Sequence, residues 1–138
     1  MNCSAPDEGN ILLLDKVATP EQKAAYLAPL SAGDIRSCFA MTEPSPGAGA
    51  DPDMLSTTAV RDGDDWVING RKWFITGAEG AAFSIVMAKT GSGATMFLVD
   101  GDNPGMQVER SLHTMDVSFS GGHGYVVFDD CRVPADRV

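Results

Sequence analysis

The chain has 138 residues, 43% of them hydrophobic and 21% charged, a composition typical of one globular domain. Its net charge of −9 argues against nucleic acid and anionic membrane surfaces as partners, because both bind clustered Lys and Arg. The longest aliphatic run, Ile11 to Leu14, is far too short for a transmembrane helix, and the first residues lack the pattern of a signal peptide.

Residues 1–37 carry helical patterns. Apolar residues at helical spacing predict a first helix through Ile11, Leu14 and Val17. A second helix should begin at Thr19, which can cap it, and Gln22 would complete a capping box. Pro29 should end or kink this helix, and Gly33 should mark the turn that follows. We interpret residues 1–37 as the C-terminal end of an α-helical domain.

Residues 38–138 show the signals of β structure, with short β-branched and aromatic runs separated by turn residues. Strands spaced in this way, without helices between them, favour a sandwich or barrel over a parallel βαβ sheet. The predicted fold is mainly β, a β-barrel domain preceded by short helices. The eight candidate strands are Cys38–Thr42, Ser56–Arg61, Asp65–Asn69, Arg71–Thr76, Phe83–Lys89, Thr95–Asp100, Met106–Arg110 and Gly124–Cys131.

Three glycine-containing segments predict turns between strands. Asn69-Gly70 is the strongest hairpin signal, because both central positions of a type I′ turn need a positive φ. Asp62-Gly63-Asp64 and Gly91-Ser92-Gly93 predict two further turns.

A long loop rich in Pro, Gly and Ala follows the first predicted strand, within the segment from Cys38 to Asp51. Its small side chains would let backbone N–H groups approach a ligand closely. Gly47-Ala48-Gly49 fails as a dinucleotide fingerprint, because Pro52 stands where the third glycine belongs and no helix pattern follows. From the residues alone, an ordinary surface loop remains the simpler interpretation.

A second candidate segment runs from Asn69 to Ala78. In a regular strand Trp73 and Phe74 would face opposite sides, while Phe74 and Thr76 would share a face. An aromatic ring beside a hydroxyl could form a platform for a flat heteroaromatic ring. The alternative is that Phe74 belongs to the core and Thr76 merely ends a strand.

Taken together and in this order, the two segments resemble the flavin-binding motifs of the acyl-CoA dehydrogenase family. The resemblance lies in Met41-Thr42-Glu43-Pro44 with its glycine-rich turn to Asp51, and in Val67 to Gly77. Thr19 to Gly33 resembles the last helices of that family's N-terminal domain, and Phe128 to Pro134 resembles the strand that closes its middle β domain. The resemblance therefore implies the middle β-barrel domain for residues 38–138.

The resemblance also implies a site for the isoalloxazine ring of FAD. Thr42 would hydrogen-bond the pyrimidine end, and the Thr76 hydroxyl would lie near N5. Ala50 would in addition contact the acyl-CoA, although the family commonly has Ser there, and Phe74 stands where many members have Trp. The implied cofactor-binding residues are Phe39, Met41, Thr42, Gly49, Ala50, Phe74, Ile75 and Thr76.

The implied reaction belongs to fatty acid β-oxidation: an acyl-CoA becomes a trans-2-enoyl-CoA by α-proton abstraction and hydride transfer to the flavin. Electrons would pass to an electron-transferring flavoprotein. The catalytic glutamate of the family lies in a C-terminal helical domain without a counterpart here, so we expect no catalytic residue in this chain and no activity from it alone. The intact enzyme would be a homo-oligomer in the bacterial cytoplasm or the mitochondrial matrix.

Two alternatives stay open at this stage. An acyl-CoA oxidase or another flavin oxidase of the same fold is compatible with Ala50, and oxygen reactivity of the reduced flavin would distinguish it. The second alternative is a truncated, non-catalytic β module, which would bind no flavin at all.

A metal site is not expected. Cys3, Cys38 and Cys131 lie far apart, without the spacing of a zinc site or a disulfide framework, which favours a reduced compartment. His113 and His123 have no Cys or acidic partner at ligand spacing.

Overall fold

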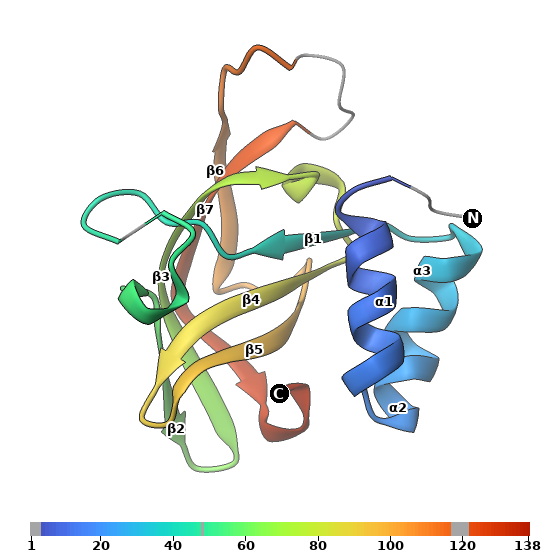
Figure 1. Ribbon diagram of the computed structural model, residues 1–138. Helices are drawn as coiled ribbons and strands as arrows, with labels where there is room; N and C mark the ends of the chain where they lie inside the picture. The colour runs from blue at the N-terminus through green and yellow to red at the C-terminus, as the bar shows by residue number, and fades with distance from the viewer. Residues whose placement is uncertain (1–3, 48, 117–121) are drawn as a thin grey trace.

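A helical segment covers one side of a curled β-sheet in the computed structural model (Figure 1). The structure describes residues 4–47, 49–116 and 122–138. Its mainly β character, with short helices at the start of the chain, confirms the predicted fold class. None of the helices in these ranges is long and apolar enough to cross a membrane.

The helical segment consists of α1 (Asp7–Val17), α2 (Pro20–Gln22), a π-helical turn η1 (Lys23–Leu27) and α3 (Ala28–Ala32). The predicted capping box is present, since the Thr19 N–H donates to Gln22 Oε1 at 3.0 Å and the Gln22 N–H to Thr19 Oγ1 at 3.2 Å. The helix continues past Pro29 and ends at Gly33, whose φ is 89°. Pro29 is tolerated because the wider π-helical turn directly precedes it.

Seven strands form one sheet: β1 (Ser37–Ala40), β2 (Thr58–Asp62), β3 (Asp65–Thr76), β4 (Phe83–Thr90), β5 (Gly93–Asp100), β6 (Met106–Ser111) and β7 (His123–Pro134). Their order is β1-β4-β2-β3-β7-β6, and β5 pairs with β4. Most pairs are antiparallel, but β1 and β2 both run parallel to β4, without a βαβ unit. Short 3₁₀ turns lie at η2 (Pro52–Met54), η3 (Ala78–Gly80) and η4 (Ala135–Arg137).

The prediction of a hairpin turn at Asn69-Gly70 is wrong. The chain continues through both residues as one strand, β3, which pairs along its length with β7. A register shift between Ile68 and Gly70 marks a β-bulge. A Cβ on Gly70 would lie 2.6 Å from the Cα of Thr57. Glycine is therefore needed here because two backbones lie close together, and not because the chain makes a tight turn. The two other predicted turns are confirmed, at Gly63-Asp64 between β2 and β3 and at Gly91-Ser92 between β4 and β5.

Two hydrophobic clusters support the fold. The first lies within the curled sheet and contains Cys38 and Cys131; burial raises the pKa of these thiols to about 11 and about 12, which keeps them protonated and unreactive. The second joins helices to strands and contains Leu14, Tyr26, Leu30, Phe83, Ile85 and Leu98. Val17, expected on the apolar side of α1, is instead 66% exposed.

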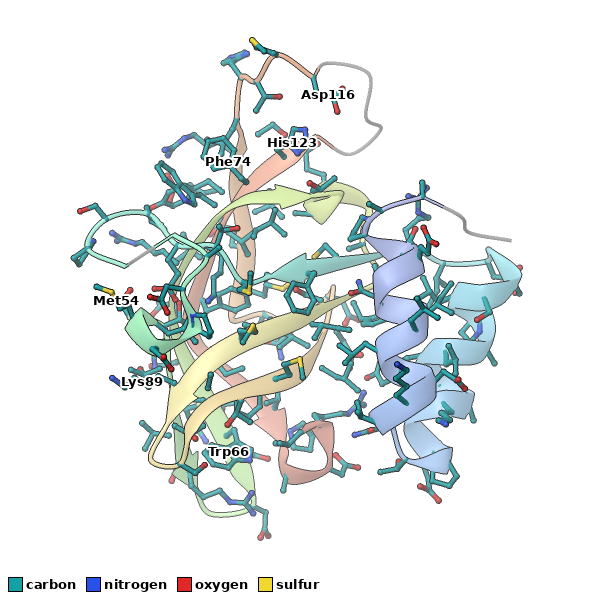
Figure 2. The ribbon with its side chains drawn as sticks, in the orientation of Figure 1. Met54, Trp66, Phe74, Lys89, Asp116 and His123 are labelled. Atoms are coloured by element: carbon teal, nitrogen blue, oxygen red, sulfur yellow. The ribbon has the colours of Figure 1, made fainter. Side chains whose placement is uncertain are left out.

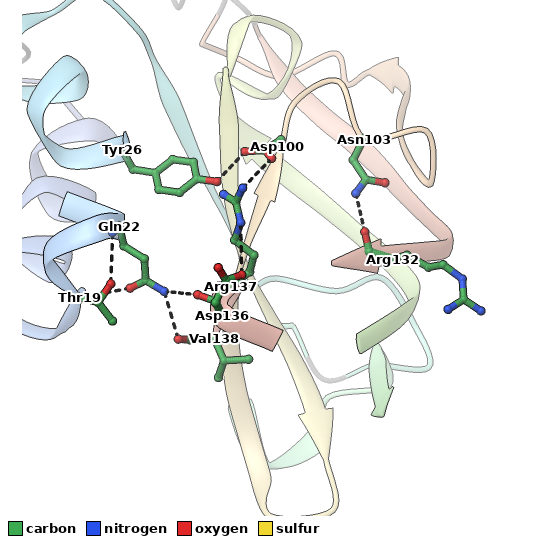
Figure 3. Close-up of polar contacts among 9 residues, drawn as sticks. All are labelled: Thr19, Gln22, Tyr26, Asp100, Asn103, Arg132, Asp136, Arg137 and Val138. Atoms are coloured by element: carbon green, nitrogen blue, oxygen red, sulfur yellow. Dashed lines mark hydrogen bonds and ion pairs between the residues drawn. The ribbon is translucent and has the colours of Figure 1, made fainter. Parts of the chain in front are cut away.

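Polar contacts tie the helical segment to the end of the chain (Figure 3). The Tyr26 hydroxyl donates to Asp100 Oδ1 at 2.7 Å, and Arg137 lies 3.5 Å from the other oxygen of the same carboxylate. The side-chain amide of Gln22 donates to the carbonyl of Asp136 at 2.6 Å. Helices and sheet therefore pack as one body at this interface.

Candidate functional site

A buried ion pair joins the glycine-rich loop to β3. Lys72 Nζ lies 2.8 Å from Glu43 Oε1, and the two side chains are 0% and 1% exposed. The same ammonium donates to the carbonyl of Met41 at 2.9 Å. The Glu43 carboxylate also accepts hydrogen bonds from the N–H and hydroxyl of Ser56, at 2.7 and 2.6 Å, and from the N–H of Thr57 at 2.9 Å.

These contacts keep both members of the pair charged. Burial alone would raise the pKa of Glu43, but hydrogen bonds from Lys72, Ser56 and Thr57 outweigh it and lower that pKa to about 2. Burial lowers the pKa of Lys72, and the hydrogen bond and charge of Glu43 partly offset this effect. A charge buried this deeply is tolerated because its partner and further donors surround it.

The loop after Glu43 is folded tightly around this carboxylate. The Glu43 N–H donates to the carbonyl of Gly49 at 3.0 Å, which closes the loop into an isolated β-bridge. A Cβ on Gly47 would lie 2.6 Å from the Cβ of Glu43, so only glycine fits there. The loop is therefore anchored around Glu43, and Gly49 itself adopts a φ of 61°.

The two motifs recognised in the sequence meet side by side. The Trp73 N–H donates to the carbonyl of Thr42 at 3.0 Å, one residue from the Lys72 contact with Met41. The Thr42 side chain is half-buried, and its hydroxyl makes no hydrogen bond to any residue that the structure describes. Thr42 can therefore offer a hydroxyl to a ligand at this junction.

The aromatic residues that follow depart from a regular strand. A register shift between Lys72 and Ile75 accompanies a φ of 54° at Phe74, and the rings of Trp73 and Phe74 lie 4.8 Å apart. The prediction that these two rings face opposite sides is therefore wrong, because the bulge breaks the alternation on which it relied. Phe74 is 48% exposed, so it presents an aromatic surface outside the core.

Thr76, at the end of β3, is half-buried and contacts a histidine. Its Oγ1 lies 3.0 Å from Nδ1 of His123, the first residue of β7. The Nε2 of that ring lies 3.8 Å from Oδ2 of Asp116. Figure 2 shows Phe74, His123 and Asp116 at the same end of the molecule.

The remaining predicted residues differ in what they can offer a ligand. Phe39 packs against the cluster shared with the helices, and the Ile75 side chain is fully buried in the core of the sheet. Ile75 could therefore contact a ligand through its backbone only, whereas Phe39 is partly buried. Met41 is half-buried beside Lys72, whereas Ala50 is exposed.

Sequence reasoning missed the partners of Glu43 and the contact of His123. Lys72 lies two residues after Gly70 and four after the buried Ile68, so the alternation of side chains along β3 places it on the inward face. A lysine at an inward position was the signal that pointed to a buried partner. Nothing local pairs Thr76 with His123, because they are 47 residues apart.

Within the described residues, one apolar pocket lies apart from the candidate site. An apolar pocket of about 240 Å³ lies between α1 and β5, lined by residues such as Leu13, Met96 and Val138, but by none of the predicted cofactor residues. Across residues 4–47, 49–116 and 122–138, no group of three His, Cys, Asp or Glu side chains could hold a metal ion.

The donor set at the junction of the two motifs suits a flat heteroaromatic ligand. Thr42 and Thr76 are half-buried and their hydroxyl oxygens can hydrogen-bond a ligand, and the exposed Phe74 ring can stack. The nearby backbone is held by the Glu43–Lys72 pair, which pre-organises these groups. The residues present therefore fit the isoalloxazine ring of a flavin.

Comparisons with known proteins identify the family of this chain. The family model "Acyl-CoA dehydrogenase, middle domain" matches residues 38–131. The Mycobacterium tuberculosis protein named Probable acyl-CoA dehydrogenase FadE2 is 41% identical across 100% of this chain, which spans 36% of that protein. A solved structure from Mycobacterium abscessus, assigned to the acyl-CoA dehydrogenases, has a TM-score of 0.91 and 44% sequence identity to this chain. The comparison covers 98% of this chain and 35% of the solved one.

A glutaryl-CoA dehydrogenase from Mycobacterium smegmatis, solved in complex with FADH2, has a TM-score of 0.81 and 34% identity. That comparison covers 93% of this chain and 32% of the solved one. The chain thus spans about a third of the length of these three proteins. It belongs to the acyl-CoA dehydrogenase family, and residues 38–131 correspond to the middle domain of that family.

Proposed function

We propose that the complete protein is an FAD-dependent dehydrogenase that oxidises an acyl-CoA thioester to the trans-2-enoyl-CoA. The observation that carries this proposal is the buried Glu43–Lys72 pair. It holds the Met41-Thr42 backbone against Trp73 and so joins the two motifs that carry Thr42, Phe74 and Thr76. When bound there, FAD would accept the hydride that leaves the β-carbon of the acyl group.

The residues of this chain bind and orient the cofactor in this proposal. Thr42 hydrogen-bonds the pyrimidine end of the ring, and Thr76 places its hydroxyl at N5. Phe74 covers the ring, while Gly49 and Ala50 approach the cofactor and the thioester through backbone atoms. Ala50 has no hydroxyl, so it contacts the acyl-CoA without a side-chain hydrogen bond. Phe39, Met41 and Ile75 complete the proposed cofactor-binding set.

We assign no general base within this chain. The Glu43 carboxylate is already engaged by Lys72, Ser56 and Thr57, and its low pKa makes it a poor proton acceptor near neutral pH. Glu79 accepts a hydrogen bond from Ser111 at the exposed surface. The base that removes the α-proton is therefore proposed to lie outside these 138 residues, and the chain alone is expected to be inactive.

The partners follow from the same proposal. We propose that the complete protein is an oligomer that passes electrons to an electron-transferring flavoprotein. Relatives include the Mycobacterium tuberculosis protein and a human protein named as a mitochondrial short-chain specific acyl-CoA dehydrogenase, 37% identical over 89% of the chain. Bacterial cytoplasm or mitochondrial matrix is the proposed location.

Replacing Thr76 with Val in the complete protein tests the proposal. The change keeps the shape of the side chain and removes its hydroxyl, so we expect flavin affinity or the rate of flavin reduction by acyl-CoA to fall by about tenfold, the value of roughly one hydrogen bond. Flavin absorbance and stopped-flow reduction measure these quantities. Thr58→Val, on an exposed position of β2, is the matched control and should change neither. Unaltered flavin content and reduction rate in Thr76→Val would contradict the assigned role.

A further inference from the structure

His123 lies across the sheet from Thr76, and two paired strands hold the contact between their side chains. The register of β3 and β7 pairs these residues directly, and Nδ1 of His123 lies 3.0 Å from Oγ1 of Thr76. Beside them the Gly77 N–H donates to the carbonyl of Gly122 at 2.9 Å. Only 15% of the His123 side chain is exposed, so bulk water competes weakly for this contact.

The opposite edge of the imidazole faces a carboxylate. Nε2 of His123 lies 3.8 Å from Oδ2 of Asp116, a negative charge that favours the tautomer with its proton on Nε2. In that tautomer Nδ1 is an acceptor, so the Thr76 hydroxyl donates to it. With its only hydrogen committed to His123, the Thr76 oxygen offers lone pairs, and no donor, to a ligand on its other side.

We propose that His123 is a positioning residue that makes Thr76 a hydrogen-bond acceptor toward the flavin and so favours the reduced cofactor. This inference rests on the proposed function, which puts flavin N5 at the Thr76 hydroxyl. N5 of the oxidised ring is an acceptor, whereas N5 of the reduced ring carries a hydrogen. A fixed acceptor at Thr76 therefore matches the reduced ring and leaves N5 of the oxidised ring without a donor.

The test is the midpoint potential of the flavin bound to the complete protein, which a merely structural role would not move. In His123→Leu the Thr76 hydroxyl can turn and donate to oxidised N5. We expect the ratio of reduced to oxidised flavin at a fixed potential to fall about tenfold, a decrease of about 30 mV for a two-electron couple. His123→Asn, whose amide oxygen can accept near the position of Nδ1, should restore most of this loss.

Two controls separate an effect through Thr76 from a general one. His113→Leu removes the other histidine of the chain, which is exposed, and should leave the potential unchanged. In a Thr76→Val background, His123→Leu should cause no further decrease, because the hydroxyl through which it acts is gone.

Three results would overturn the inference: a potential that is unchanged or raised in flavin-loaded His123→Leu, an equal decrease in the Thr76→Val background, or no restoration by His123→Asn. Wild-type protein without flavin would instead overturn the proposed function itself, so the two failures are distinguishable. Should His123→Leu fail to fold, ¹⁵N NMR of the wild-type imidazole decides: an unprotonated, hydrogen-bonded Nδ1 supports the inference, and a protonated Nδ1 in the neutral ring overturns it.

Discussion

The residue that organises the candidate site is Glu43, which contacts no proposed ligand directly. Its buried carboxylate accepts hydrogen bonds from Ser56 and Thr57, just before β2, and from Lys72 on β3. An ion pair so deeply buried contributes little net stability when intact, but removing one partner leaves an uncompensated charge. Glu43 therefore matters chiefly for holding the loop in one arrangement.

We predict that Glu43→Gln destabilises the chain strongly. The substitution leaves the Lys72 ammonium buried without a counter-charge, and we expect the free energy of unfolding to fall by about 3–5 kcal/mol. Urea unfolding followed by tryptophan fluorescence measures this change. Asp62→Asn is the control, because it removes a pair with Arg132 whose side chains are 59% and 55% exposed, and it should cost less than about 1 kcal/mol.

The same variant should change how stability depends on pH. Because the pKa of folded Glu43 is about 2, below its ordinary value of 4.5, its stabilisation is complete above about pH 4.5 and is lost as the pH falls toward 2. That difference in pKa corresponds to about 3 kcal/mol. Glu43→Gln should lack this part of the acid dependence, and identical acid-unfolding curves for both proteins would contradict the assignment.

Sequence reasoning singled out the two motifs but not the contacts that hold them together. Met41, Thr42 and Trp73 could be recognised because they belong to contiguous motifs. The Glu43–Lys72 contact joins residues 29 apart, and its distance depends on how the loop folds onto the sheet, which no local pattern determines.

At the scale of elements, β3 shows that strand pairing can override a local turn signal. Asn-Gly is a strong hairpin signal in isolation, but here β7 pairs with both halves of β3 and keeps them in one strand. At Gly70 the backbone of β3 lies against Thr57, at the end of the loop anchored on Glu43. By contrast, the capping box at Thr19 was predictable because all of its contacts are local.

We predict that Gly70→Ala destabilises the chain and loosens the loop. The new methyl group would meet the backbone of Thr57, a clash whose cost we expect to be about 1–3 kcal/mol or more. Gly91→Ala, in the β4–β5 turn, has open space around its Cβ and a φ outside the positive region, so it is the matched control. Urea midpoints compare the two, and equal midpoints would show that the close approach at Gly70 is not required.

At the scale of the whole molecule, the predicted boundary at residue 37 separates two regions that share a core. β1 begins at Ser37, the last residue of the predicted helical region. Yet Leu14, Tyr26 and Leu30 pack with Phe83, Ile85 and Leu98 in a single cluster. Tyr26 also hydrogen-bonds Asp100 on β5, and Gln22 hydrogen-bonds Asp136 near the end of the chain. Composition indicates where helices give way to strands, but it does not indicate whether the two regions bury surface against each other.

This shared cluster predicts that a destabilising substitution in the helices also destabilises the sheet. Leu30→Ala would leave a cavity beside β4 and β5, because Leu30 is fully buried there, and we expect a loss of about 2–5 kcal/mol. Hydrogen exchange should then accelerate at the amides of Ile85 and Leu98 as well as in α1 and α3. Leu12→Ala is the matched control, because Leu12 is 58% exposed and its truncation should cost less than about 0.5 kcal/mol. Faster exchange confined to the helices would show that residues 4–36 form an independent unit, and the sheet would then hold the candidate site without their support.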